Sequence, residues 1–320
     1  MAASKTNYVC TLSKAQAEQL HGLMEERGWE FDVAPYAYWR GKKDKTNVVA
    51  YESGKLTVQG AGTADFVQFL LEPEILKEAR FGYETELAVV ENPAMFLPHA
   101  GIDESGKGDF FGPLVVACCY TEGDMARRLL QAGVADSKTI KTERKIFELA
   151  DLIRKEAAGR FNIIVLMPET YNRLYASIGN LNRLLAWGHA KTLENVLEKV
   201  PYCPRAISDQ FAQSATTVQR ALQSRGRQIQ LEQHPKAEAD VAVAAASILA
   251  RAEFVQRMKA LGEQAGMPLP KGASAEVLKT AKLLVQQLGA ETLPKFAKMH
   301  FKTAAEVLEI KNEDGDNASA

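Results

Sequence analysis

The sequence has 320 residues, of which 46% are apolar and 25% charged, an ordinary composition for a globular protein. It has no signal pattern and no apolar run long enough to span a membrane, so neither export nor membrane insertion is expected. The net charge of −1 excludes a uniformly basic nucleic-acid binder, so any surface for nucleic acid must be local. The cysteines lack metal-site spacing and fit a reducing, cytoplasmic location: Cys10, Cys118, Cys119 and Cys203.

Residues 1–76 are predicted to form a small α+β domain. A strand at 8–12 precedes a helix whose start carries a capping box made by Ser13 and Gln16. Four further strands are expected, at 29–33, 37–40, 47–51 and 55–59. A second helix over 64–71 should end at the proline that follows it. An antiparallel sheet of this kind has one packed face and one free face.

The free face of this sheet is expected to carry aromatic residues interleaved with basic ones: Tyr36, Tyr38, Trp39, Arg40 and Lys42. Platforms of this composition bind nucleic-acid strands, because bases stack on the aromatic rings and phosphates attract the cations. In the alternative interpretation the aromatic residues are simply core. Both interpretations stay open at the level of the sequence.

Residues 77–97 show no sustained periodicity and are interpreted as a linker to a second domain at 98–311. The polar, acidic residues 312–320 are expected to be disordered. Strands of the second domain are predicted to end at Asp103 and to cover 114–120, 161–167, 204–209 and 228–232. Helices are predicted at 125–132, 143–158, 181–200, 241–261 and 274–288. A hairpin followed by strands that alternate with helices predicts an α/β fold with a mixed sheet.

The most informative stretch is His99–Tyr120, in which two adjacent acids, Asp103 and Glu104, end an apolar strand and a glycine-rich loop follows. The glycines of this loop are Gly106, Gly108 and Gly112. A dinucleotide-binding loop would lead into a helix, whereas this loop leads into the apolar run 114–120, which is typical of a strand. Acids beside exposed backbone amides suit a hard metal ion together with a phosphate or a ribose.

Three more acids stand at the ends of predicted elements, because Asp209 ends a strand while Glu238 and Asp240 precede a helix. Strand ends converge at one edge of an open sheet, so these acids are expected to meet Asp103 there. Carboxylates that meet repel one another unless a divalent cation neutralises them. Because all-oxygen ligands select Mg²⁺ or Mn²⁺ over zinc, one of these two ions is the expected cofactor.

Each acid also has a structural interpretation. An aspartate at a strand end, such as Asp209, is a common turn former, and Asp240 is a candidate helix N-cap. Adjacent strand residues point to opposite faces, so Asp103 and Glu104 share one site only if the chain bends, which Gly106 permits. Two histidines in this region, His189 and His300, are interpreted as packed or surface residues rather than ligands.

The segment Gly101–Pro113 closely resembles the signature of type 2 ribonucleases H, and of ribonuclease HIII among them. Further matching motifs follow in order: Asp136–Lys138, Ile207–Phe211, Lys236–Glu238, Val243–Arg251, Leu269–Ala273 and Lys298–Phe301. The resemblance covers residues 99–303. By architecture, the N-terminal unit is similar to the TATA-box-binding-protein-like domain that this family carries ahead of its catalytic domain.

The resemblance implies a ribonuclease H-like mixed β-sheet flanked by helices. It also implies an endonuclease that cleaves the RNA strand of RNA–DNA hybrids and leaves 3′-hydroxyl and 5′-phosphate ends. Two metal ions about 4 Å apart can activate a water for in-line attack and stabilise the leaving oxygen. RNA is distinguished from DNA by its 2′-hydroxyl, which is exposed in a shallow minor groove.

Carried over by position, the resemblance makes Asp103, Glu104 and Asp209 the metal-binding acids. Glu238 falls at the place of the fourth acid, but the segment after it is about one residue short, so Asp240 is a rival. The family's loop contacts the ribose, which implies this role for Gly106, Lys107 and Gly108, while Lys138 would contact a backbone phosphate. Tyr38 and Arg40 are the expected contacts of the N-terminal domain, whose binding of the hybrid would be salt-sensitive.

Two other functions are weighed against cleavage of continuous hybrids. A type HII enzyme incises at single ribonucleotides in DNA, but such enzymes usually carry Arg at the position of Lys107 and lack the N-terminal domain. A non-catalytic hybrid-binding protein would not need all three core acids. The expected partner is therefore an RNA–DNA hybrid, with no membrane, and the chain is expected to be a monomer.

Overall fold

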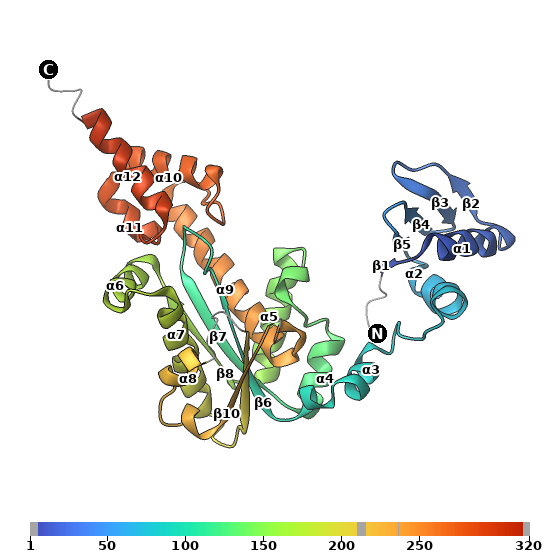
Figure 1. Ribbon diagram of the computed structural model, residues 1–320, viewed down its shortest axis with the longest axis horizontal. Helices are drawn as coiled ribbons and strands as arrows, with labels where there is room; N and C mark the ends of the chain where they lie inside the picture. Colours follow the sequence, from blue (N-terminus) through green and yellow to red (C-terminus); the bar gives the residue numbers. More distant parts are fainter. Residues whose placement is uncertain (1–5, 210–215, 236, 316–320) are drawn as a thin grey trace. The chain divides into compact units, whose positions relative to one another are not determined.

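The computed structural model describes residues 6–209, 216–235 and 237–315, and the chain forms two compact units, Met1–Glu91 and Asn92–Ala320 (Figure 1). Each unit contains its own five-stranded sheet. Within the described ranges, none of the helices combines the length and apolar character needed to cross a membrane. The α/β class predicted from the sequence is confirmed.

The N-terminal unit contains the strands β1 (Asn7–Thr11), β2 (Glu30–Asp32), β3 (Ala37–Lys43), β4 (Thr46–Tyr51) and β5 (Lys55–Gly60). Its helices are α1 (Lys14–Glu26), α2 (Thr63–Phe66), the π-helix η1 (Val67–Leu76) and α3 (Glu84–Glu91). The strands pair antiparallel in the order β1-β5-β4-β3-β2. The predicted capping box is present at the start of α1, where Ser13 and Gln16 exchange hydrogen bonds. The four strands after α1 lie where they were predicted, with ends that differ by at most three residues.

The aromatic residues of β3 divide between the two faces of the sheet. Trp39 is buried in the core against α1, and its indole N–H donates to the carbonyl of Ala17 at 3.1 Å. Its neighbour Tyr38 is 44% exposed, and Tyr36 just before the strand is 84% exposed. The expectation that Trp39 belongs to the free face is wrong, because the two-residue period of a strand places it opposite Tyr38 and Arg40.

The second helix of this unit does not end at Pro73 as predicted. It begins as α2 and continues as the π-helix η1 through Pro73 to Leu76, where Lys77 takes a left-handed conformation. A proline breaks an α-helix because its ring meets the carbonyl four residues earlier. In a π-helix each hydrogen bond spans five residues instead of four, so the α-helical hydrogen-bond pattern that a proline disrupts is not the one present at Pro73.

The second unit contains β6 (His99–Ser105), β7 (Leu114–Thr121), β8 (Phe161–Leu166), β9 (Arg205–Asp209) and β10 (Gln230–His234). Its α-helices are α4 (Gly123–Gln131), α5 (Glu143–Ala157), α6 (Pro168–Ile178), α7 (Leu181–Leu197), α8 (Thr216–Ala221), α9 (Val241–Ala265), α10 (Ala275–Leu288), α11 (Leu293–Phe296) and α12 (Lys302–Gly315). Short 3₁₀ turns are η2 (Pro93–Phe96), η3 (Ser137–Thr139), η4 (Gly226–Gln228), η5 (Ala237–Ala239) and η6 (Ala290–Thr292).

The sheet of this unit has the strand order β10-β9-β6-β7-β8 and is mixed, as predicted. Strands β7 and β8 continue antiparallel from β6, whereas β9 and β10 lie parallel to it on the other side. Helices α7 and α9 cover opposite faces (Figure 1). The α7 face packs on Ile102 and Val116, while α9 approaches β6 so closely at Gly101 that a Cβ there would lie 2.1 Å from the Val243 nitrogen. The carboxyl ends of β6 and β9 therefore lie together between these two helices.

Several helices of this unit were not predicted from the sequence, namely α6, α8, α11 and α12. Helix α12 continues to Gly315, so residues 312–315, which were expected to be disordered, are helical. No proline or glycine interrupts the chain between the start of α12 and Gly315, so polarity alone does not stop the helix. Residues 316–320 lie outside the described residues. In the predicted linker 77–97, helix α3 and the turn η2 are formed.

Candidate active site

The two adjacent acids lie on opposite faces at the end of β6. Pairing of β6 with β7 stays regular through Ser105 and Val115, so the chain does not bend before the acids. Glu104 points toward α7, where its Oε2 lies 2.9 Å from Nε2 of His189. Asp103 points toward α9, where its carboxylate is hydrogen-bonded by Ser247. The bend that Gly106 would permit is absent before the acids. The two carboxylates instead flank the strand end, close enough for the charge of Glu104 to raise the pKa of Asp103.

Asp103 is the most perturbed acid of this region. Burial raises its pKa to about 7, and the negative charges of Glu104 and Asp209 act in the same direction. Hydrogen bonds from Ser247 and from the Glu104 backbone N–H, which is 2.8 Å from Oδ1, act against the rise without cancelling it. The hydrogen bonds only partly offset the cost of a negative charge on Asp103, so a cation bound beside this carboxylate would be stabilised.

Glu104 has the opposite balance. Burial acts to raise its pKa, but the hydrogen bond and the charge of His189 outweigh that effect, and the pKa is lowered. Lys107, whose Nζ lies 3.7 Å from Oε1, contributes to the lowering. Glu104 is therefore kept as the anion of the adjacent pair.

The sequence interpretation missed the role of His189. This residue of α7 is fully buried, and besides Glu104 it contacts the hydroxyl of Ser208 at 3.0 Å through Nδ1. Ser208 in turn donates to the carbonyl of Asp209. His189 thus joins an acid of β6 to the end of β9. The only signal in the sequence was a histidine within the apolar stripe of α7, where burial of an imidazole demands polar partners.

Asp209 ends β9, the strand that runs parallel beside β6. The parallel register pairs Ile102 with Ser208, so the residues that follow them, Asp103 and Asp209, lie side by side. Both side chains lie on the α9 side of the sheet. One carboxylate oxygen of Asp209 accepts from the Ala237 N–H at 3.3 Å. The predicted convergence of these two acids is present, while Gln210 and Phe211 of the same motif lie outside the described residues.

Glu238 and Asp240 have different surroundings. Glu238, on the turn η5, lies 3.7 Å from the Nζ of Lys138. Burial acts to lower the pKa of Lys138, but the carboxylates of Glu238, Asp136, Asp103 and Asp209 outweigh it and the pKa is raised. Glu238 therefore shares the electrostatic environment of the β6 acids. Lys236 of the same motif lies outside the described residues.

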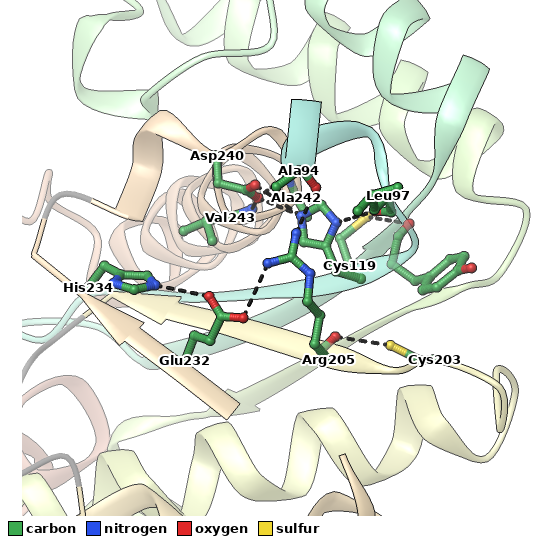
Figure 2. A network of polar contacts seen from close by, with 12 residues as sticks. Ala94, Leu97, Cys119, Cys203, Arg205, Glu232, His234, Asp240, Ala242 and Val243 are labelled. Atoms are coloured by element: carbon green, nitrogen blue, oxygen red, sulfur yellow. Dashed lines mark hydrogen bonds and ion pairs between the residues drawn. The ribbon is translucent and has the colours of Figure 1, made fainter. Parts of the chain in front are cut away.

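Asp240 serves the start of α9. Its Oδ1 accepts from the backbone N–H groups of Ala242 and Val243 at 2.8 and 3.2 Å, as an N-cap does. It also contacts Nε2 of His99 at 2.9 Å, at the first residue of β6 and so at the opposite end of that strand from Asp103. Figure 2 shows Asp240 at the start of α9, beside Ala242 and Val243, in a polar network that also contains the Arg205–Glu232 ion pair.

The Lys138 turn is fixed by α9. Ser137 shares a 2.8 Å hydrogen bond between hydroxyls with Ser247, and its carbonyl accepts from the guanidinium of Arg251. Asp136 caps the turn by accepting from the Lys138 N–H at 2.9 Å. With this backbone fixed, the Lys138 side chain remains 75% exposed and directed at the acids.

The glycine-rich loop is closely packed at one glycine and open at another. Gly106 has φ +89°, and a Cβ there would lie 2.2 Å from the Pro113 carbonyl oxygen, so only glycine fits. At Gly108 a Cβ would meet nothing within 4 Å, and the residue is exposed. Open space over Gly108 leaves the backbone free for the approach of another molecule.

Tyr38 and Arg40 belong to the N-terminal unit, and Arg40 is engaged on its own sheet. Its guanidinium forms an ion pair with Asp32, which also contacts Lys42 at 2.9 Å. Hydrogen bonds from these two cations lower the pKa of Asp32. The acid partly neutralises the basic patch that the sequence indicated.

The acids at the end of β6 fit a hard divalent cation by their chemistry, since every side-chain donor is a carboxylate oxygen. Burial, and after it the negative charges of Glu104 and Asp209, raise the pKa of Asp103, and a bound cation would offset both effects. Among the residues that the structure describes, no three Asp, Glu, His or Cys side chains converge on one ion position. The fit therefore rests on donor type and charge.

Family models match both units. A family model described as ribonuclease HII matches residues 100–304, and one described as a domain of unknown function, DUF3378, matches residues 7–80. Ribonuclease HIII of Chlamydia pneumoniae is 41% identical over 301 residues, covering 94% of this chain and 97% of that protein. Ribonuclease HIII of Protochlamydia amoebophila is 39% identical over 301 residues, covering 94% and 96%.

A solved structure agrees with these relatives. The crystal structure of Bst-RNase HIII in complex with Mn²⁺ matches with a TM-score of 0.64 and 30% identity, covering 96% of this chain and all of that one. The sequence resemblance is thereby confirmed for the family and the fold. The chain belongs to the type 2 ribonuclease H family and, within it, to the ribonucleases HIII.

Proposed function

We propose that this chain is an endonuclease that cleaves the RNA strand of RNA–DNA hybrids by metal-dependent hydrolysis, leaving 3′-hydroxyl and 5′-phosphate ends. The observation that supports this most is the carboxyl end of β6. There the half-buried Asp103, with its raised pKa, lies beside Glu104 and Asp209. Such a cluster of acids matches the requirement of phosphodiester hydrolysis for divalent cations.

In this proposal Asp103, Glu104 and Asp209 bind Mg²⁺ or Mn²⁺, which supplies the Lewis-acid chemistry for phosphodiester hydrolysis. Glu238 is the fourth acid of the site. Its ion pair with Lys138 supports this choice over Asp240, which caps α9 near the other end of β6. His189 orients Glu104 through a hydrogen bond, as residues behind metal ligands do.

The substrate would be read by the backbone of the glycine-rich loop. Gly106, Lys107 and Gly108 would contact the ribose of the RNA strand, where the exposed backbone at Gly108 gives access to a 2′-hydroxyl. Lys138 would bind a neighbouring phosphate through its exposed ammonium group. Recognition of a hydroxyl by fixed backbone atoms rejects DNA, because DNA leaves those atoms unpaired.

The N-terminal domain, residues 1–76, would add affinity for the hybrid, with Tyr38 and Arg40 as contacts. Residues 77–97 would link it to a catalytic domain at 98–311. The chain would act as a monomer in the cytoplasm.

The test of this function is a cleavage assay with Mg²⁺, and in parallel with Mn²⁺, on two matched duplexes. One is a continuous RNA–DNA hybrid, and the other is DNA with a single ribonucleotide. Strong cleavage of the hybrid and weak cleavage of the second duplex is the expected result. The reverse preference would assign the chain a type HII activity, and binding without cleavage of either would leave it a hybrid-binding protein.

A further inference from the structure

A fully buried lysine lies beneath the glycine-rich loop. Lys298, in the segment between α11 and α12, has no exposed surface, and its Nζ lies 2.7 Å from the Asp109 carbonyl oxygen and 3.5 Å from that of Phe111. The ammonium group also lies 5.7 Å from the ring centroid of Tyr171. Among the described residues, no carboxylate lies within 4.0 Å of this Nζ. A lysine is almost never fully buried without a polar partner, so the two carbonyls account for the burial of this one.

The segment around Lys298 fixes consecutive peptide groups of the loop. The Asp109–Phe110 peptide is held at both ends, because its carbonyl accepts from Lys298 Nζ and its N–H donates to Gly272 at 2.9 Å. The carbonyl of Phe110 accepts from the backbone N–H of Lys298 at 2.9 Å. The Phe111–Gly112 peptide is again held at both ends, through Lys298 Nζ and the Phe296 carbonyl.

These contacts are costly to lose, because the peptides lie in the interior. Phe110 and Phe111 are fully buried, so a carbonyl there without a donor would lack both water and a protein partner. A long side chain that ends in several N–H donors can reach two such carbonyls at once. Burial lowers the pKa of Lys298 to about 7, and the neutral amine still has two N–H groups for the two carbonyls.

The fixed peptides adjoin the part of the loop that faces solvent. The N–H of Asp109 donates to the Gly106 carbonyl at 3.4 Å, which closes a turn over Lys107 and Gly108. The Asp109 side chain accepts from the Gly272 N–H at 2.6 Å. On its other side the turn continues from β6. The orientation of the backbone at 106–108 therefore depends on where Asp109 is placed.

We propose that Lys298 is a positioning residue that sets the glycine-rich loop in the geometry required to recognise the ribose of the RNA strand. This inference rests on the proposed function. Lys298 does not touch the substrate, and its effect reaches the substrate through the Asp109 and Phe111 carbonyls. Without it, the exposed turn would sample other orientations, and the advantage of RNA over DNA would fall.

The test is the variant Lys298→Met, which keeps the length and apolar stem of the side chain and removes its donors. The full-length variant is compared with the wild type in steady-state cleavage of a continuous hybrid. Affinities for that hybrid and for a DNA duplex of the same sequence are measured without divalent metal. We expect KM to rise about tenfold with kcat changed by less than about twofold, the pattern of lost binding rather than lost chemistry. The ratio of the affinity for the hybrid to the affinity for DNA should also fall about tenfold in the variant.

Two controls separate positioning from general destabilisation. Lys295→Met removes an exposed lysine of the adjacent helix α11 and should match the wild type. Leu129→Ala creates a cavity in the buried core of α4, and lowers the melting temperature without touching the loop. If Lys298→Met lowers the melting temperature as Leu129→Ala does, but keeps the wild-type KM and hybrid preference, the residue is only structural and the inference is wrong. A wild type that cleaves no hybrid would instead overturn the proposed function.

Discussion

The two sheets of this protein present their functional residues in contrasting ways. At the end of β6 the acids are largely buried, and each is tied to a partner from a covering helix, Glu104 to His189 and Asp103 to Ser247. On the N-terminal sheet Tyr38 is exposed, and Arg40 forms a surface ion pair with Asp32. Burial leaves the charge of Asp103 poorly compensated without a ligand, whereas solvent and the Asp32 ion pair stabilise the charge of Arg40.

This difference indicates a division of labour. Precise, partly buried groups suit chemistry, because their geometry is fixed before the substrate arrives. Exposed aromatic and basic groups suit the binding of a nucleic-acid strand, because they can adapt to its phosphate backbone. Affinity that comes from such contacts falls as the salt concentration rises. Changes at the two sheets should therefore have different effects on turnover and on affinity.

The site at the carboxyl ends of β6 and β9 should lose most of its catalytic activity when one of its acids is replaced by the corresponding amide. Asp103→Asn and Asp209→Asn should each lower kcat by about 10³-fold or more, since several kcal/mol of transition-state stabilisation depend on the cation site. Hybrid binding should change little, because the acids do not contribute attraction for phosphates. The measurement is kcat together with hybrid affinity, and near-normal turnover in either variant would contradict the metal assignment.

Glu238 and Asp240 should respond differently to the same change of charge. Glu238→Gln is expected to lower kcat about 10²-fold, as loss of a group at the reacting centre does. Asp240→Asn should keep most of the activity and lower the free energy of unfolding by about 1 kcal/mol, because it weakens the cap of α9. Both variants are compared by steady-state kinetics and by urea denaturation. A large loss of kcat in Asp240→Asn, with near-normal kcat in Glu238→Gln, would make Asp240 the fourth acid.

The contact between His189 and Glu104 should also matter for rate. His189→Ala removes the hydrogen bond that orients Glu104 and is expected to lower activity about 10- to 100-fold, the usual range for a residue behind a metal ligand. His234→Ala, an exposed histidine of β10, is the matched control. Equal activity of the two variants would show that Glu104 needs no support from α7.

The N-terminal unit should affect affinity rather than rate. Removal of residues 1–91, the whole compact unit, is expected to raise KM for the hybrid about tenfold while kcat changes by less than about twofold. The dependence of hybrid affinity on salt should also become shallower, since fewer phosphates are contacted. An unchanged KM and salt dependence would leave this unit without a role in binding.

The last prediction concerns stability rather than activity, and it is a dependence of the free energy of unfolding on pH. Burial lowers the pKa of Lys298 to about 7, so between pH 7 and the unfolded lysine pKa of about 10.4 the unfolded chain binds a proton that the folded chain has released. The contribution of Lys298 to the free energy of unfolding therefore rises with pH across this window. In urea denaturation, the difference in stability between wild type and Lys298→Met should grow from pH 7 to pH 10. Lys295→Met should give no such trend.

The sequence predicted those features that local pattern determines. Short runs of strand-forming residues, some alternating and some continuously apolar, located the sheet of each unit, and the spacing of Ser13 and Gln16 located a helix start. The acids of β6 and β9 were found because they end apolar strands, and strand ends converge. The resemblance supplied the family, which the comparisons confirm.

What the sequence did not predict depends on long-range packing. Glu104 is bonded by His189, which is 85 positions away in the sequence, and the carbonyl of Asp109 is bonded by Lys298, which is 189 positions away. No local periodicity links residues so far apart. The opposite directions of Asp103 and Glu104 follow from pairing of β6 with β7 that continues to Ser105. The sequence left open whether Trp39 belongs to the core or to the free face, because aromatic residues serve both cores and binding platforms, and the structure places it in the core.

The central claim is that the acids at the carboxyl end of β6 bind the cation on which hydrolysis depends. It is tested most directly by titrating Mn²⁺ into the wild type and into Asp103→Asn, with free Mn²⁺ followed by electron paramagnetic resonance. We predict that the wild type binds Mn²⁺ and that the variant loses this binding while its melting temperature shows that it is folded. Equal Mn²⁺ binding by the two proteins would contradict the claim.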